Sequence, residues 1–230
     1  MVRSRWWPRL LLGAGAIALF AAIVSISVGT GGPKVIKLSG GDQVQQLLGG
    51  IQEDGADLGP PSATVTISVF NDLQCSTCDE YQLHTVDPLI EEYARTEKAR
   101  FEFRNYSLGQ AVTTKAAYAA VAAGEQDREW EFVDMFFRNQ DAAPQSNVST
   151  EFLNDIGNSI TDLDLETWRT DMESAEVKDR VEADGTLAAD YGLRINGPSI
   201  VVEGPDGTKV LQDSPSQQDV EDAVAAVGGT

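Results

Sequence analysis

The hydrophobic pattern separates an apolar N-terminal segment from a longer mixed part of the chain. Residues 10–28 form an apolar run without a charged side chain, and Arg3, Arg5 and Arg9 precede it. As a helix, such a run is about 28 Å long, which is close to the hydrocarbon thickness of a bilayer. The arginines orient it with residues 1–9 in the cytoplasm and the rest of the chain outside. We therefore predict a single transmembrane helix as an anchor, with a cleaved signal peptide as the alternative.

Alternating hydrophobic and polar positions predict strands in the mixed part of the chain. Residues 64–70 alternate and are rich in β-branched side chains, and residues 100–106 alternate again. Residues 199–203 and 208–211 flank a Gly-Pro-Asp-Gly turn, which is typical of a β-hairpin. Residues 34–38 fit a further short strand. Helical patterns separate the strands, so the sequence predicts an α/β fold.

Helical periodicity accounts for most of the remaining residues. A helical stretch opens at Cys75, and Pro88 is expected to kink or restart it. The aromatic residues from Trp130 to Phe137 have amphipathic spacing, which indicates the core of a helical block, with a client-binding groove as the alternative. The expected helices beyond the one at Cys75 are residues 43–51, 115–123, 127–138, 150–156, 165–172, 176–191 and 217–227. Residues 55–62 are expected to be irregular because of their glycine and prolines.

Charge and cysteine content exclude two classes of function. The formal net charge is −19, which repels phosphate backbones and argues against nucleic-acid binding. Two cysteines and one histidine are too few for a Cys/His zinc site, and we expect no metal. The histidine, His84, is nine residues from Cys75, on the opposite side of a straight helix, so a Cys-His protease is disfavoured. His84 is expected at the surface or the edge of the core.

The two cysteines form the one motif with a chemical mechanism, Cys75-Ser76-Thr77-Cys78. Residues three apart on a helix share a face, so their sulfurs can form a disulfide. A cysteine at a helix N-terminus has its thiolate stabilised by free N–H groups and the helix dipole. We expect Cys75 to be the attacking nucleophile and Cys78 the resolving cysteine of a mixed disulfide. Ser76 and Thr77 between them are expected to tune the redox properties.

The sequence resembles the exported, DsbA-like thiol:disulfide oxidoreductases of the thioredoxin-fold family, from about Gly59 to the C-terminus. The resemblance rests on residues 58–60 (Leu-Gly-Pro), 69–78 (Val-Phe-Asn-Asp-Leu-Gln-Cys-Ser-Thr-Cys) and 195–199 (Ile-Asn-Gly-Pro-Ser). It implies a thioredoxin fold, a central mixed sheet flanked by helices, at residues 59–230 with a helical insertion at about 112–191. Residues 29–58 are then a linker with an N-terminal strand and helix. The resemblance also implies that Pro198 is a cis-proline facing the dithiol, and that Gly197 and Pro198 pair with an extended client segment.

The sequence departs from the family in three ways. Ser76 and Thr77 occupy positions where related sites often carry a thiolate-stabilising histidine. Asp79 and Glu80 follow in the first turn, where their charges repel a thiolate. Val69 stands where the family often has a buried acid, six residues before the first cysteine, so a carboxylate relay to Cys78 is in doubt. We therefore expect a milder oxidant than the histidine-containing members.

The function expected from these features is thiol–disulfide exchange with secreted protein clients through Cys75 and Cys78. The redox-active disulfide needs no cofactor, and a separate membrane partner is expected to recycle it. The catalytic domain is expected to be extracytoplasmic, on a single-pass anchor in the cell membrane, or secreted if the segment is cleaved. Two alternatives stay open: a reductase or isomerase of the same fold, and a non-catalytic binding module with a structural disulfide. A disulfide between Cys75 and Cys78 closes only a small ring, so it removes little conformational entropy from the unfolded chain. This makes the structural alternative weaker.

Overall fold

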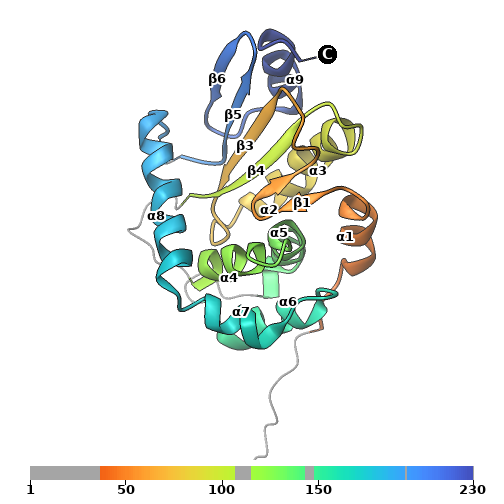
Figure 1. Ribbon diagram of the computed structural model, residues 1–230, viewed down its shortest axis with the longest axis vertical. Helices are drawn as coiled ribbons and strands as arrows, with labels where there is room; N and C mark the ends of the chain where they lie inside the picture. The colour runs from red at the N-terminus through yellow and green to blue at the C-terminus, as the bar shows by residue number, and fades with distance from the viewer. Residues whose placement is uncertain (1–36, 107–114, 143–147, 195, 230) are drawn as a thin grey trace, which may run out of the picture. The chain divides into compact units, whose positions relative to one another are not determined.

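A mixed sheet organises the computed structural model, which describes residues 37–106, 115–142, 148–194 and 196–229. The chain divides into two units, Met1–Lys34 and Val35–Thr230, and the described residues all belong to the second. The strand order is β1-β2-β4-β3-β5-β6 (Figure 1). Only β3 and β4 are parallel to each other; the other neighbouring pairs are antiparallel. The strands are β1 (Glu53–Asp54), β2 (Asp57–Leu58), β3 (Thr66–Asn71), β4 (Arg100–Asn105), β5 (Ser199–Gly204) and β6 (Gly207–Leu211).

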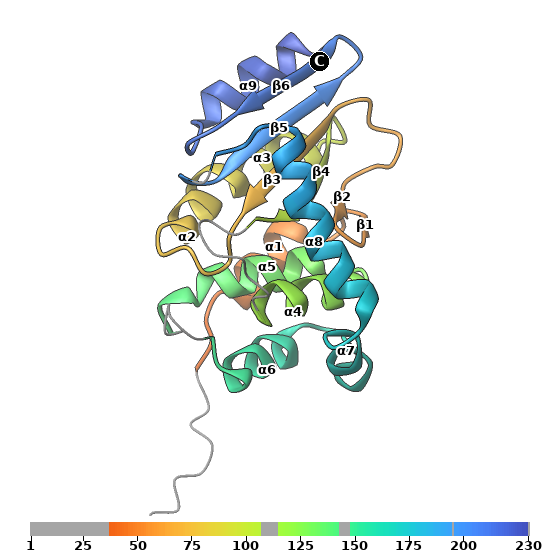
Figure 2. The same cartoon turned by 90° about the vertical axis from the view of Figure 1, so that its left-hand side faces the viewer.

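Helices cover the sheet and form a separate block at one end of it (Figures 1 and 2). Helices α4 to α7 gather in this block, α8 returns from it alongside the sheet, and α9 packs against β5 and β6. The α-helices are α1 (Gly41–Leu48), α2 (Cys78–Tyr81), α3 (Asp87–Leu89), α4 (Lys115–Gly124), α5 (Glu129–Arg138), α6 (Thr150–Ser159), α7 (Leu165–Asp171), α8 (Ala175–Asp190) and α9 (Gln217–Ala226). The π-helical segments η1 (Gln82–Val86) and η2 (Ile90–Ala94) and the 3₁₀ turn η3 (Gln140–Ala142) complete the helical elements. This arrangement is the α/β fold with a helical insertion that the sequence predicts.

Strand β3 is buried on both faces because helices pack on either side of it. Its residues Ile67 and Val69 join the larger core cluster. Phe70 points the other way, into a second cluster with Val201 and Ala188 of α8. Alternate side chains of a strand point to opposite faces, so both faces of a central strand in a covered sheet must be apolar. β3 therefore lies at the centre of the fold and carries the chain directly to the cysteines.

Trp130 attaches the helical block to the sheet. Its ring is completely buried and makes edge-to-face contacts with Phe101 and Phe103 of β4, with centroid distances of 6.2 and 5.8 Å. The indole Nε1 donates to the carbonyl of Ala56 at 2.7 Å, which satisfies its buried polar atom. Phe136 is buried as well. The aromatic residues of α5 are thus core, and the alternative of a client-binding groove is wrong for these side chains.

The helical segment after the cysteines accommodates Pro88 by widening. A proline in a helix lacks an N–H and clashes with the carbonyl four residues earlier, here that of His84. The backbone N–H of Asp87 donates to the carbonyl of Gln82, five residues back, which is the π-helical pattern. The segment continues to Ala94 through η1, α3 and η2 instead of breaking. The expectation that Pro88 perturbs the helix is confirmed, and the perturbation is a π-helical turn and not a break.

Two expectations for the N-terminal part of the domain are wrong. Lys37 and Leu38 form no strand, and residues 34–36 of the predicted strand lie outside the described chain. The backbone N–H of Ser39 instead donates to Asn139 Oδ1 at 2.8 Å, so the chain here is bound to the helical block. Within residues 55–62, expected to be irregular, β2 pairs with β4, and β1 pairs with β2. Strands of two residues are too short to show an alternating pattern.

No helix within the described residues is long and apolar enough to cross a membrane. The apolar run at residues 10–28 lies outside them.

Candidate active site

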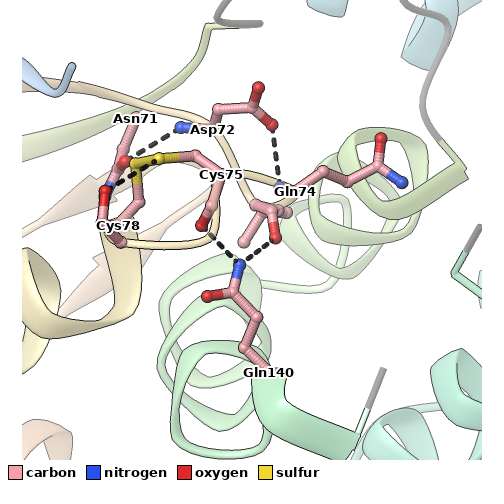
Figure 3. Close-up of a disulfide and its surroundings, with 8 residues drawn as sticks. Asn71, Asp72, Gln74, Cys75, Cys78 and Gln140 are labelled. Carbon is pink, nitrogen blue, oxygen red and sulfur yellow. Dashed lines mark hydrogen bonds between the residues drawn. A yellow bond between two sulfur atoms is a disulfide. The ribbon is translucent and has the colours of Figure 1, made fainter. Parts of the chain in front are cut away.

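Cys75 and Cys78 form a disulfide in the segment that joins β3 to α2 (Figure 3). Their Cα atoms are 5.3 Å apart, within the ordinary range for a disulfide. Cys78 is completely buried in the main core, whereas Cys75 is only partly buried at its edge. Cys75 is therefore the cysteine of the pair that an incoming thiol can approach.

The backbone around the cysteines is a series of tight turns. The Asp72 carboxylate accepts from the Gln74 N–H at 2.8 Å, and the Cys75 N–H donates to the Asp72 carbonyl at 3.1 Å. The Cys78 N–H then donates to the Cys75 carbonyl at 3.3 Å, which closes the turn that brings the sulfurs together. The predicted helix start at Cys75 is wrong, since α2 begins at Cys78. The local turn bonds take up the backbone groups that a helix from Cys75 would have used.

The two residues between the cysteines are both exposed. The Thr77 hydroxyl lies 3.7 Å from the Cys75 sulfur, and it can donate a weak hydrogen bond to that atom, which has no hydrogen of its own in the disulfide. The Ser76 side chain has no hydrogen bond to the disulfide among the described residues. Neither residue carries a charge. A role for them in tuning the redox properties of the site stays a prediction.

Gln140 of the helical block reaches the cysteine segment from below (Figure 3). Its Nε2 donates to the carbonyl of Leu73 at 2.7 Å and to the carbonyl of Cys75 at 2.9 Å. Gln140 is only 5% exposed. No sequence pattern points to Gln140 as a site residue, because 65 positions separate it from Cys75 and no local signal links them.

A neutral amide stands at the end of the strand that leads to the site. Val69, at the position of the acid expected in the family, is completely buried among apolar residues. Asn71 lies two positions further along β3, so its side chain points to the same face. Its Oδ1 accepts from the Asp72 N–H at 2.9 Å, while its Nδ2 is buried without a hydrogen-bond partner within the described chain. The end of β3 therefore provides an amide, and no carboxylate, on the face toward Cys78.

A buried charge network lies along the same helical segment as Cys78. Arg138 of α5 donates to Asp87 at 2.6 Å and to Asp134 at 3.0 Å. Gln82 donates to the other oxygen of Asp87 at 3.3 Å. Burial first, and then the charge of Asp134, raise the pKa of Asp87 to about 7. One guanidinium faces two carboxylates here, so the pair of carboxylates retains a proton near neutral pH.

Gly197 and Pro198 lie at the end of β5 that is next to the cysteine segment. Phe70 of β3 pairs with Ser199, so Pro198 is level with the point where the chain leaves β3. Both residues are buried. No cis peptide bond occurs in the described chain, so the expectation of a cis bond before Pro198 is wrong for this structure. The trans isomer is preferred by about 0.5–1 kcal/mol, and here the Pro198 carbonyl accepts from the Ser214 N–H at 2.8 Å.

His84 is exposed on η1, as expected for a surface histidine. Across the described ranges, no group of three or more His, Cys, Asp or Glu side chains has an arrangement that could hold a metal ion.

Comparisons with known proteins agree with this geometry. A family model described as "Thioredoxin" matches residues 52–225. The "Probable disulfide bond formation protein D" of Bacillus anthracis is 28% identical over 151 residues, which cover 64% of this chain and 69% of that protein. The Bacillus subtilis "Disulfide bond formation protein D" is 24% identical over 147 residues, covering 63% of this chain and 66% of that protein.

Solved structures share the fold. Oxidised BdbD from Bacillus subtilis superposes with a TM-score of 0.64 at 21% identity, over 75% of this chain and 91% of that one. Alpha-DsbA1 from Wolbachia pipientis superposes with a TM-score of 0.61 at 18% identity, over 80% of this chain and 94% of that one. The family model spans most of the folded unit and includes both cysteines. The chain therefore belongs to the thioredoxin family, as a DsbA-like thiol–disulfide oxidoreductase.

Proposed function

We propose that this protein is a membrane-tethered, extracytoplasmic oxidase that transfers the Cys75–Cys78 disulfide to secreted client proteins. The observation that carries the proposal is the asymmetric burial of the two cysteines within a thioredoxin-family fold. A structural disulfide gains nothing from one accessible sulfur. An exchange disulfide requires it, because the attacking thiolate must approach one particular sulfur in line with the bond that breaks.

The exchange proceeds in two balanced steps. A client thiolate attacks the Cys75 sulfur, the Cys75–Cys78 bond breaks, and Cys78 leaves as a thiolate that takes up a proton. A second client thiolate then attacks the client sulfur of the mixed disulfide. Cys75 leaves with the electron pair, so the client gains the disulfide and the protein is left as a dithiol. A separate membrane oxidant must remove two electrons and two protons to restore the Cys75–Cys78 disulfide.

Oxidation is favoured over reduction by the names of the relatives, which are called disulfide bond formation proteins. The site itself supports a moderate oxidant. The exposed Ser76 and Thr77 provide no cationic group for the Cys75 thiolate, while the Thr77 hydroxyl is close enough to donate to it. A thiolate with fewer stabilising groups makes the reduced form less favourable, and therefore the disulfide less oxidising.

The client segment is proposed to bind beside Gly197 and Pro198. The pairing of β3 with β5 supports this, since it brings these residues to the same end of the sheet as the cysteine segment. An extended peptide can hydrogen-bond to free backbone groups beside the end of such a strand. The anchor at residues 10–28 would keep the domain close to a membrane partner that reoxidises it, and no further cofactor is needed.

The reduction potential of the purified full chain tests the direction of electron flow. A value of about −120 to −180 mV supports the oxidase, whereas a value near −270 mV, typical of thioredoxin, favours the reductase. Oxidation of a reduced, unfolded client protein by a stoichiometric amount of the disulfide form tests the transfer itself. A chain that leaves such a client reduced would support the structural-disulfide alternative.

A further inference from the structure

We infer that Gln140 is a positioning residue that holds the Cys75–Cys78 turn closed while the disulfide is open. The inference rests on the proposed function and deepens it. It assigns to the helical insertion a direct part in disulfide exchange, through a hydrogen-bonded link between its η3 turn and the cysteine segment.

The donor capacity of the Gln140 amide is used entirely on this segment. A side-chain amide nitrogen carries two hydrogens, and the two acceptors here are the carbonyls of Leu73 and Cys75, at 2.7 and 2.9 Å. The amide cannot be flipped, because its oxygen would then face two other oxygens. In this structure Oε1 is buried and has no hydrogen-bond partner in the described chain. Among the described residues, the cysteine segment therefore provides all the hydrogen-bond partners of the Gln140 amide.

The Cys75 carbonyl is the critical acceptor because two donors share it. It receives the Gln140 amide and also the Cys78 N–H, whose 3.3 Å bond closes the turn between the cysteines. When the disulfide is intact, the S–S bond itself keeps the sulfurs together. Once the bond opens, these two hydrogen bonds act directly on the Cys75 carbonyl and keep it directed at the Cys78 N–H, while the Asp72 turn bonds hold the residues before it. Gln140 therefore raises the effective concentration of the Cys78 sulfur at Cys75.

The same link makes a thermodynamic difference between the two redox states. Without Gln140, the reduced loop gains conformational freedom that the disulfide form cannot gain, since a covalent ring already restrains it. The dithiol becomes relatively more favourable, so the disulfide becomes more oxidising. Resolution of a mixed disulfide by Cys78 becomes slower, whereas the bimolecular attack by the partly exposed Cys75 sulfur changes little.

The test uses the reduced full chain and glutathione disulfide. Cys75 attacks the glutathione disulfide and releases one glutathione thiolate; Cys78 then attacks the Cys75 sulfur and releases the second. Acid quenching followed by mass spectrometry resolves the two steps. We expect Gln140→Met, which keeps length and removes the donors, to slow the second step about tenfold, as expected for losing one or two buried hydrogen bonds. The first step should stay within about twofold of the wild type, and the equilibrium constant should shift about tenfold, or about 30 mV toward a more oxidising disulfide.

Asn139→Leu is the matched control. Asn139 is the adjacent residue, a similarly buried amide whose Nδ2 donates to the backbone carbonyls of Ser39 and Met135, away from the cysteines. Its loss should lower stability without changing the second step. Equal slowing in both variants, or in neither, would overturn the inference.

Gln140→Glu provides a second readout that general destabilisation does not move. A carboxylate at this position repels the two carbonyl oxygens, whereas a protonated carboxyl donates one hydrogen bond. Its second-step rate, taken relative to the wild type at each pH, should rise as the pH falls, while that of Gln140→Met stays flat. A flat ratio for Gln140→Glu would contradict the inference. These rate ratios test the role of Gln140 separately from the proposed function. The proposed function fails only if the wild type cannot oxidise a client, whatever the ratios are.

Discussion

The two sulfurs differ in burial, and this difference assigns their roles at the residue scale. Cys78 has no exposed surface, and Cys75 lies at the edge of the core beside the exposed Ser76 and Thr77. A large client thiol can reach only the outer sulfur. The inner sulfur can act only within the chain, either as leaving group or as resolving nucleophile.

Replacing the inner cysteine should therefore trap clients. In Cys78→Ala, a mixed disulfide on Cys75 has no intramolecular route to resolution, so we expect covalent adducts to accumulate in cells. Non-reducing electrophoresis with mass spectrometry detects them.

Cys75→Ala serves as the control for this experiment, because its remaining thiol is buried. Adducts in Cys75→Ala at the same level as in Cys78→Ala would show that the two roles are not divided between the sulfurs.

The carboxylate of Asp87 gives the molecule a pH-dependent stability. Its pKa in the folded state is about 7, well above the value of 3.8 for an exposed aspartate, so the folded state binds a proton that the unfolded state has lost. Stability from this proton is complete below about pH 4 and is lost as the pH rises toward 7. The pKa of Glu129 is also raised to about 7, mainly by complete burial.

Asp87→Asn should reduce this dependence. The amide stays neutral, so the free energy of unfolding of the variant relative to the wild type should rise by about 3 kcal/mol between pH 4 and pH 7. Glu129 still titrates, so the slope of the variant is smaller than that of the wild type but not zero. Urea denaturation across the pH range measures it. Asp222→Asn, which changes an exposed carboxylate, is the control; parallel curves for wild type and Asp87→Asn would disprove the assignment.

At the scale of elements, hydrogen bonds at helix ends decide where several helices begin. Ser216 caps α9 in a complete capping box, in which its hydroxyl accepts from the Asp219 N–H and the Asp219 carboxylate accepts from the Ser216 N–H. By contrast, Thr77 at the start of α2 makes no side-chain cap. The redox turn therefore depends on groups from elsewhere in the fold, whereas α9 carries its own start signal.

Ser216→Ala should destabilise the protein by about 1 kcal/mol, because the N-cap bond to the Asp219 N–H is lost. Chemical denaturation measures the loss. Ser216→Asp, another side chain that caps well, should restore most of it. Helix α9 packs against β5 and β6, and the Tyr81 hydroxyl of α2 donates to the Pro215 carbonyl just before α9 at 3.0 Å. That bond does not use the Ser216 side chain, so the reduction potential should not change; a shift in potential would link the cap of α9 to the site.

The pattern of the sequence predicts long elements well and short ones poorly. Strands β3 and β4 and the helices of the insertion lie within a few residues of the predicted ranges. Strands β1 and β2 are not predicted, because a strand of two residues is too short to show an alternating pattern. The start of α2 is displaced from Cys75 to Cys78 because Asp72 and Gln140 bind the backbone of this segment.

At the scale of the whole molecule, the insertion both packs on the sheet and reaches the redox site. Trp130 fixes α5 against β4, and Gln140, just beyond the end of α5, binds the cysteine segment. The Asp184 carboxylate of α8 accepts from the Asn105 N–H at 2.9 Å and from Arg104 at 3.2 Å, which ties the return of the insertion to β4. The site is thus assembled from parts of the chain that are distant in sequence.

Deletion of residues 1–34 should separate redox chemistry from membrane attachment. All described residues lie in the second compact unit, Val35–Thr230, so we expect the truncated protein to fold, to keep the reduction potential of the full chain, and to move from the membrane to the soluble fraction. Cell fractionation and redox titration test both points. Equal membrane association of both forms would contradict an anchor at residues 10–28.

The sequence alone determines the longer strands, the helical insertion and the dithiol, because periodicity and the Cys-x-x-Cys spacing are local properties of the chain, and its resemblance to the DsbA-like proteins indicates the family. Only the tertiary structure decides which sulfur is accessible, where α2 begins, that the bond before Pro198 is trans, and that Gln140 binds the Cys75 carbonyl. Burial and hydrogen bonding depend on residues that folding brings together from distant positions, and no local pattern records them.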